Sequence, residues 1–290
     1  MSFTKRLLSG EFVVLAEMDT PKGVDVSELT ANARRVKERV DAVVVPDMDN
    51  GVMRMSALGG GVLLRDQGVE SLIHVYCRDR NRMALQGDLL AAHAMGLQNI
   101  VIVHGEEMEK GDHREADTVT DMDELSLIDA VAGLQGGKDM AGFELKGAPQ
   151  FTMGCTLAPF ADDAALENEM TLARRKIAAG ARFVITPPVF DLDRFAAFME
   201  VAKGLDVPII PTVFLLKSVA IARYMVRYEP GTFIPEETIK RIRKASDREQ
   251  ESLRIAGETV AALRGLCAGV KIQTLGWEHR LPEILDFAGI

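Results

Sequence analysis

The chain has 290 residues, a formal net charge of −9, 47% hydrophobic residues and 27% charged residues. This length allows one large domain with a substantial core or two small ones, and the composition is ordinary for a soluble globular protein. The negative charge argues against a nucleic-acid-binding surface, and no apolar run approaches the roughly 20 residues that cross a bilayer. We therefore expect neither nucleic acid nor a membrane as a partner.

The three cysteines, Cys77, Cys155 and Cys267, lie far apart and form no Cys-x-x-Cys pair. Their spacing argues against a zinc or iron–sulfur site, so we expect no metal and three reduced thiols. The N-terminal residues are interrupted by Ser9-Gly10-Glu11 and lack a small-residue cleavage site, which argues against a signal peptide. A cytoplasmic location is the resulting expectation.

Short apolar runs alternate with longer amphipathic patterns along the chain. Each run is continuous, as in a strand of a parallel sheet that is buried on both faces. Eight strand–helix units in about 250 residues favour a single (β/α)8 TIM barrel over residues 1–290, an α/β fold, rather than an open doubly wound sheet. The predicted strands are Phe12–Glu17, Asp41–Pro46, Glu70–Tyr76, Asn99–His104, Gln150–Leu157, Arg182–Thr186, Val207–Val213 and Gly269–Thr274.

The amphipathic patterns between these strands predict helices. Asp79 is the expected N-cap of the helix after the third strand, and Gly59-Gly60-Gly61 is interpreted as a tight turn. The charged segment Gly105–Thr120 is expected to be a lid or a ligand clamp at the barrel mouth. The predicted helices are Val26–Val40, Asn81–Met95, Asp123–Leu134, Asp163–Ala179, Asp191–Lys203, Leu216–Tyr228, Pro235–Leu266 (two helices or one bent helix) and Pro282–Phe287.

Two polar residues in the apolar strands are candidates for chemistry, because a TIM barrel keeps its active site at the carboxyl ends of its strands. Glu17 ends the first strand after apolar neighbours, so desolvation should raise its pKa and suit it to general acid catalysis. The alternative is a structural glutamate that caps a loop or pairs with an arginine. His74 is a lone polar residue in the third strand, and is either a catalyst or a hydrogen-bonded core histidine.

Other strand ends carry further candidates. Asp47 follows the second strand, His104-Gly105-Glu106 closes the fourth, and Thr186-Pro187-Pro188 ends the sixth. Gly105 would let a ligand approach the backbone closely, whereas Glu106 is either a ligand contact or a solvated loop charge. The basic run Arg174-Arg175-Lys176 is either a solvated helix face or a binding site for a diphosphate.

Five segments, in order along the chain, resemble the methylenetetrahydrofolate reductase family of flavin-dependent (β/α)8 barrels. The first holds the family's acidic residue at the end of strand one, and the third matches a Leu-Arg-Gly-Asp segment. The fourth matches a Leu-Lys-Arg-Lys segment that is followed by Ala-Gly-Ala. The segments are Ala16-Glu17-Met18-Asp19-Thr20-Pro21, His74-Val75-Tyr76-Cys77-Arg78-Asp79, Val103-His104-Gly105-Glu106, Leu172-Ala173-Arg174-Arg175-Lys176 and Ile185-Thr186-Pro187-Pro188-Val189-Phe190-Asp191.

The resemblance implies reduction of 5,10-methylenetetrahydrofolate to 5-methyltetrahydrofolate with FAD, or FMN as the alternative. It implies that Glu17 is the general acid and that Glu106 stabilises a cation on the substrate. The cofactor-binding residues that it implies are His74, His104, Gly105, Glu106, Glu169, Arg175 and Lys176. Besides tetrahydrofolate, the implied partners are an electron donor, which is NAD(P)H, ferredoxin or an iron–sulfur partner subunit, and further subunits of a homo- or hetero-oligomer. The length also resembles that of compact reductases from anaerobic one-carbon pathways.

Three positions differ from the family's pattern. Glu106 replaces an aspartate, His104 an arginine, and Pro187 a folate-binding glutamine. Two other functions stay open, and the altered positions after strands four and six suggest the first of them. One is a flavin-free barrel that binds folate or transfers methyl groups, and the other is a docking subunit of an electron-transfer complex.

Overall fold

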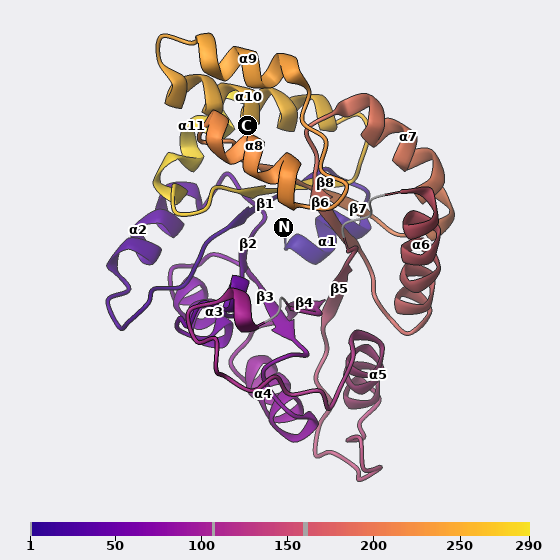
Figure 1. Ribbon diagram of the computed structural model, residues 1–290. Coiled ribbons are helices and arrows are strands. Elements are labelled where there is room, and N and C mark those ends of the chain that lie inside the picture. Colours follow the sequence, from indigo (N-terminus) through magenta and orange to yellow (C-terminus); the bar gives the residue numbers. More distant parts are fainter. Residues whose placement is uncertain (1, 106–107, 159–161) are drawn as a thin grey trace.

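Eight parallel strands form a closed barrel in chain order, and β8 pairs back onto β1. The computed structural model describes residues 2–105, 108–158 and 162–290. In Figure 1 the strands surround the centre of the molecule and the helices lie outside them. The predicted TIM barrel is confirmed, and each strand lies within two residues of its predicted bounds. The strands are β1 Val13–Glu17, β2 Ala42–Val45, β3 Ser71–Tyr76, β4 Asn99–Val103, β5 Thr152–Thr156, β6 Val184–Pro188, β7 Ile209–Phe214 and β8 Gly269–Gln273.

The helices follow the strands as predicted, with two additions. The segment Pro235–Leu266, predicted as two helices or one bent helix, forms two helices. The first, α9, ends at Lys244, and Asp247 caps the start of α10. No helix in the described parts of the chain is both long and apolar enough to span a membrane. The helices are α1 Phe3–Leu8, α2 Ser27–Val36, α3 Ala57–Asp66, α4 Arg82–Ala94, α5 Glu124–Gln135, α6 Asp163–Ala178, α7 Leu192–Ala202, α8 Val219–Tyr228, α9 Glu236–Lys244, α10 Arg248–Leu263 and α11 Leu281–Phe287.

Alternate residues of several strands belong to two different hydrophobic cores. Along β1, Val13 and Leu15 pack in the barrel interior, whereas Val14 and Ala16 pack against the surrounding helices. This alternation follows from the two-residue period of a strand. It places the next residue of the interior series, Glu17, inside the barrel at the carboxyl end of β1.

The first additional helix, α1, closes the amino end of the barrel. Phe3 and Leu7 are buried in the interior core, and the Phe3 ring meets the edge of Phe183 with a centroid separation of 5.6 Å. The Thr4 hydroxyl donates to Oδ1 of Asn99 at 3.1 Å, at the start of β4. Figure 1 shows α1 within the ring of helices rather than outside it. Six residues are too few to show a helical period, so the sequence pattern did not reveal this helix.

The second additional helix, α3, contains Gly59-Gly60-Gly61, so the predicted tight turn is wrong. The glycines allow the helix to lie close to the sheet. A Cβ on Gly60 would lie 2.5 Å from Cγ2 of Thr20 and 2.9 Å from Cγ1 of Val45. Glycine runs favour turns because their backbone is flexible, whereas in α3 it is the lack of a side chain that matters.

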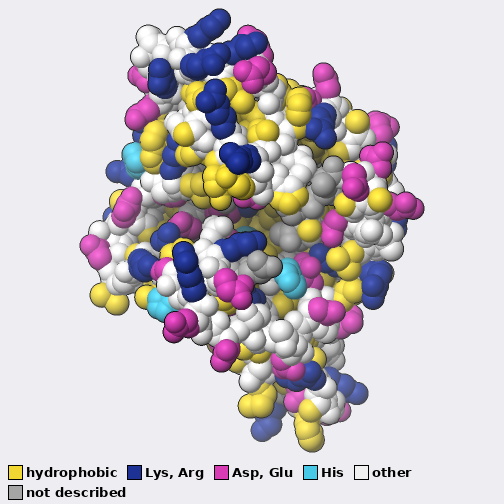
Figure 2. All heavy atoms as spheres, in the orientation of Figure 1, with side chains coloured by type: hydrophobic (Ala, Val, Ile, Leu, Met, Phe, Trp, Pro, Cys, Tyr) yellow, Lys and Arg dark blue, Asp and Glu magenta, His cyan; other side chains and the backbone are white. Residues whose placement is uncertain are grey.

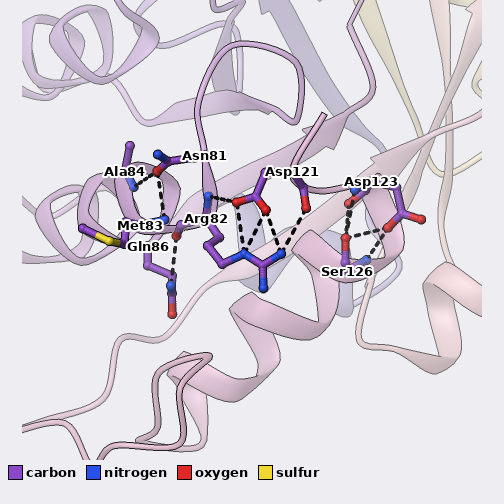
Figure 3. Close-up of polar contacts among 8 residues, drawn as sticks. All are labelled: Asn81, Arg82, Met83, Ala84, Gln86, Asp121, Asp123 and Ser126. Carbon is purple, nitrogen blue, oxygen red and sulfur yellow. Dashed lines mark hydrogen bonds and ion pairs between the residues drawn. The ribbon is translucent and has the colours of Figure 1, made fainter. Parts of the chain in front are cut away.

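The predicted cap at Asp79 is also wrong, because Asn81 caps α4. The Asn81 Oδ1 accepts hydrogen bonds from the amides of Met83 and Ala84, each at 3.1 Å, as Figure 3 shows. Asp79 instead accepts from Nε of Arg78 at 2.6 Å. The two residues lie two positions apart, and both are favoured at an N-cap.

We predict that Gly60→Ala lowers the free energy of unfolding by about 1–3 kcal/mol, because the new methyl group overlaps Thr20 and Val45. The matched control is Gly87→Ala in α4, where a Cβ meets nothing within 4 Å. That change should stabilise the protein by up to about 1 kcal/mol, because alanine favours a helix over glycine. Urea unfolding of both variants measures the contrast, and equal effects would contradict the packing argument.

Candidate functional site

A buried ion pair joins the two strands that close the barrel. Lys271 lies opposite Leu15 in the β1–β8 register, and its Nζ donates to Oε2 of Glu17 at 2.7 Å. Glu17 is 5% exposed and Lys271 is 8% exposed. Both side chains therefore lie inside the barrel, near its carboxyl end. Glu17 is therefore also a paired glutamate, as the sequence-based alternative proposed, but its partner is a lysine rather than an arginine.

Burial sets the protonation of Glu17. Desolvation raises the pKa of its carboxyl above the ordinary value, the positive charge of Lys271 opposes that rise, and the negative charge of Asp49 adds to it. The predicted direction is confirmed. A carboxyl with a raised pKa can hold a proton for a substrate and release it inside the barrel.

His74 also points into the barrel, between the interior residues Leu72 and Tyr76. It is 7% exposed, and burial together with the charge of Lys271 lowers its pKa to about 3. Neither ring nitrogen has a hydrogen-bond partner among the described residues. The core histidine of the sequence-based alternative would be hydrogen-bonded, so this neutral ring instead offers an unused donor and an unused acceptor to a ligand.

Tyr76 connects this strand to the loop after β2. Its hydroxyl donates to Oδ1 of Asp49 at 3.0 Å, and the Arg78 guanidinium lies over its ring, 5.1 Å from the centroid. Arg78 is itself buried and donates to the carbonyl of Met48 at 3.1 Å. The carboxylate of Asp49 is thereby held near Glu17.

The end of β4 lies against the same tyrosine. Gly105 has a φ of +92°, and a Cβ there would lie 2.7 Å from Cδ1 of Tyr76. A glycine is therefore required at this position by the fold itself, whatever ligand binds nearby. His104 is exposed, and Glu106 lies outside the described residues.

Two of the predicted cofactor-binding residues, Lys176 and Glu169, lie at the end of β5. The buried Nζ of Lys176 donates to Oε1 of Glu124 at 2.8 Å and to the carbonyl of Thr156 at 3.1 Å. Glu169 accepts from the amide of Ala158 at 3.0 Å, whereas Arg175 is exposed. Within this structure Lys176 and Glu169 support the strand end, and Arg175 presents its charge to solvent.

Asp47 has a structural role. Its Oδ1 accepts from the amide of Ala57 at 3.0 Å, and its Oδ2 accepts from Nη1 of Arg80 at 2.6 Å. Both carboxylate oxygens are therefore used in holding α3 and the loop after β3. This strand-end residue is not available to a substrate in the way that Glu17 is.

Pro187 and Pro188 line an open pocket of about 350 Å³ beside the mouth. Its other walls are mainly apolar and include Phe195 and Phe198 of α7 and Phe233 after α8. Figure 2 shows this face of the molecule with side chains of both charges around a central hollow and with hydrophobic side chains gathered beside it. The mouth therefore combines a charged interior with an apolar flank.

The segment predicted as a lid runs beside the loops after β1 and β2. Gly111 packs on Gly51, and the amide of Asp112 donates to the carbonyl of Gly51 at 3.2 Å. The Asp112 carboxylate pairs with Lys22 and accepts from the amide of Met53 at 3.0 Å. These contacts hold three loops together at the barrel mouth.

Lys271 is not among the site residues predicted from the sequence. The pattern that could have indicated it is the one that indicated His74, namely a polar residue in the interior series of an apolar strand. A lysine in a strand usually extends its ammonium group to solvent. Only the closure of β8 onto β1 reveals the carboxylate that keeps it inside.

The sequence profile described as methylenetetrahydrofolate reductase matches residues 2–289. The chain belongs to this family. A protein named methylenetetrahydrofolate reductase 2 from Saccharomyces cerevisiae is 25% identical over 191 residues, which are 63% of this chain and 29% of that protein. Methylenetetrahydrofolate reductase 1 from Schizosaccharomyces pombe is 21% identical over 162 residues, 54% of this chain and 24% of that one. The chain thus spans less than a third of these relatives.

Solved structures share the barrel at low sequence identity. A structure from Aquifex aeolicus VF5 has a TM-score of 0.52 and 12% identity, and covers 99% of this chain and 93% of its own. A long-chain alkane monooxygenase has a TM-score of 0.53 and 9% identity, with 97% and 90% covered. These two likenesses show the fold alone.

We predict that His74 makes stability depend on pH in the acid range. Because its folded pKa is about 3 and its ordinary value is 6.5, the unfolded chain binds this proton more readily. The free energy of unfolding should fall as the pH falls between these values, by at most about 1.4 kcal/mol per pH unit from this residue. His74→Gln should remove that slope in urea unfolding, whereas His279→Gln, at an exposed site, should retain it. An unchanged slope in His74→Gln would contradict the assignment.

Proposed function

We propose that this chain is a flavin-dependent reductase that converts 5,10-methylenetetrahydrofolate to 5-methyltetrahydrofolate. Family membership supports the reaction class. The observation that carries the proposal is the pairing, in one barrel mouth, of a carboxyl whose pKa is raised with a neutral histidine that has no hydrogen-bond partner among the described residues. The first can supply a proton, and the second can bind a polar ligand.

The residues fit a flavin. The two ring nitrogens of His74 are buried in the barrel interior without a partner in the described parts of the chain, and a bound ring system with polar edge atoms would satisfy them. When bound, the flavin supplies the hydride chemistry. His74 would contact its ring, His104 and Gly105 would lie beside it, and the exposed charge of Arg175 would lie toward its phosphates. Lys176 and Glu169 would support the strand end next to them. A site for a diphosphate favours FAD over FMN.

Glu17 would act on the folate. Opening of the imidazolidine ring requires a proton on the departing nitrogen, and the buried Glu17 carboxyl can donate it. The substrate then carries a positive charge, which we assign Glu106 to stabilise. The electron donor in this proposal is reduced nicotinamide, ferredoxin or an iron–sulfur partner subunit.

We predict that the purified protein has the absorption spectrum of an oxidised flavin, and that anaerobic 5-methyltetrahydrofolate bleaches it by running the half-reaction backward. A flavin that remains oxidised would support the proposed cofactor but contradict folate as the substrate. Pro187→Gln would then be the first variant to test. A colourless protein that cannot be reconstituted with FAD or FMN would overturn the proposal in favour of a flavin-free barrel.

We predict that Glu17→Gln lowers the rate of the folate half-reaction by about 10²–10⁴-fold, the usual contribution of a general acid. Reduction of the flavin by its electron donor should continue, because that step needs no proton from Glu17. Stopped-flow absorbance separates the two rates. Glu28→Gln makes the same chemical change on the exposed face of α2 and should alter neither. Loss of both half-reactions in Glu17→Gln would contradict the assigned role.

A further inference from the structure

We propose that Lys271 is a positioning residue that controls how tightly Glu17 holds its proton and stabilises the carboxylate that remains after donation. This inference rests on the proposed function, since it concerns the residue assigned as the acid. Lys271 belongs to none of the segments that resemble the reductase family. The argument depends on the contacts, charges and burial of the pair.

The contact leaves one carboxyl oxygen for the substrate. Lys271 Nζ is bonded to Oε2 of Glu17 at 2.7 Å, and Oε1 accepts no hydrogen bond from the described residues. In the donation step, the proton leaves Oε1 for the departing nitrogen, which keeps the electron pair of the breaking C–N bond. The carboxylate that results is already bonded to an ammonium group. A proton from water restores the acid before the next turnover.

The other charges around Glu17 make this lysine necessary. Asp49 from the loop after β2 and Asp19 beyond the end of β1 are both acidic, and both disfavour a charge on Glu17. His74 of β3 faces the same lysine and is neutral at physiological pH. Among the described residues acting on Glu17, Lys271 of β8 is the cation. Without it, donation would leave a buried carboxylate beside two other acids.

Stability alone does not explain a lysine here. Removing an ammonium group from water is costly, and buried ion pairs are often no more stabilising than apolar residues of similar volume. The barrel interior around β1 and β8 is otherwise filled by side chains such as Val13 and Leu15. A charged residue at this interior position therefore indicates a role in the chemistry of its partner.

The test compares Lys271→Met with Lys271→Arg in the flavin-containing protein. The folate half-reaction in the forward direction, in which reduced flavin reacts with 5,10-methylenetetrahydrofolate, requires protonated Glu17, so its rate falls as the pH rises through the pKa of that carboxyl. A cation lowers the pKa of a neighbouring carboxyl by about 1–3 units. In Lys271→Met this falling limb should therefore move to higher pH by about that amount, while the maximal rate decreases. Lys271→Arg should restore the limb, and flavin reduction by the donor should be unchanged in both.

A second measurement needs no folate. Because the folded pKa of Glu17 is raised above its ordinary value of 4.5, stability is lost as the pH rises through the folded pKa. In Lys271→Met this loss should extend to higher pH. The double variant Glu17→Gln with Lys271→Met lacks the carboxyl and should not show this pH dependence. Because the single and double variants differ only at residue 17, the difference between their free energies of unfolding in urea reports the Glu17 carboxyl alone.

The outcomes separate the two proposals. An unchanged pH limb in Lys271→Met, or an equal pH dependence of stability in the two variants, would overturn the role of Lys271 while leaving the reductase in place. A wild-type protein that does not react with methyltetrahydrofolate would overturn the proposed function, and the stability measurement would still test the pair. If Lys271→Met does not fold, Lys271→Gln is the substitute, because its amide can still donate a hydrogen bond to the Glu17 carboxyl.

Discussion

The pairing of β8 with β1 is the constraint on which the site depends. It joins the first and last strands of the barrel and places Lys271 against Glu17, two residues that lie 254 positions apart in the chain. A closed barrel has no free edge, so the register of each strand fixes which side chains point inward. The ion pair is therefore a product of closure and cannot form in an open sheet.

Burial within this barrel has opposite effects on two neighbouring groups. It disfavours the charged form of each, so the carboxyl of Glu17 retains its proton to a higher pH while the imidazole of His74 loses its proton. Lys271 then opposes the effect on the glutamate and strengthens the effect on the histidine. Burial thus favours the uncharged form of both neighbours, and the one cation weakens that preference in the glutamate while it strengthens it in the histidine.

Much of the fold could be predicted from the sequence, because short apolar runs separated by amphipathic patterns have few other solutions. The errors came where local pattern and packing differ. The glycines of α3 indicated a turn by their flexibility, although Gly60 is required by its contact with Thr20 and Val45. The short helix α1 has no period to detect.

The site was predictable only in part. Glu17 and His74 stand out as polar residues in apolar strands, and the structure places both inside the barrel. Asp47 also follows a strand, where a barrel would carry a catalytic acid, yet its two carboxylate oxygens accept hydrogen bonds from Ala57 and Arg80. Such partners are set by tertiary contacts between loops, and nothing in the local sequence of Asp47 or of Lys271 specifies them.

The helix α1 has a consequence for the order in which the protein assembles. Helices shorter than about 12 residues rarely persist in water on their own, so this stretch gains its shape from the barrel that it enters. Before the barrel exists, Phe3 and Leu7 have no interior in which to lie, and Thr4 has neither Asn99 nor Thr152 to bind. Docking of α1 is therefore expected to follow the formation of the strands that it contacts, which makes it a late folding event.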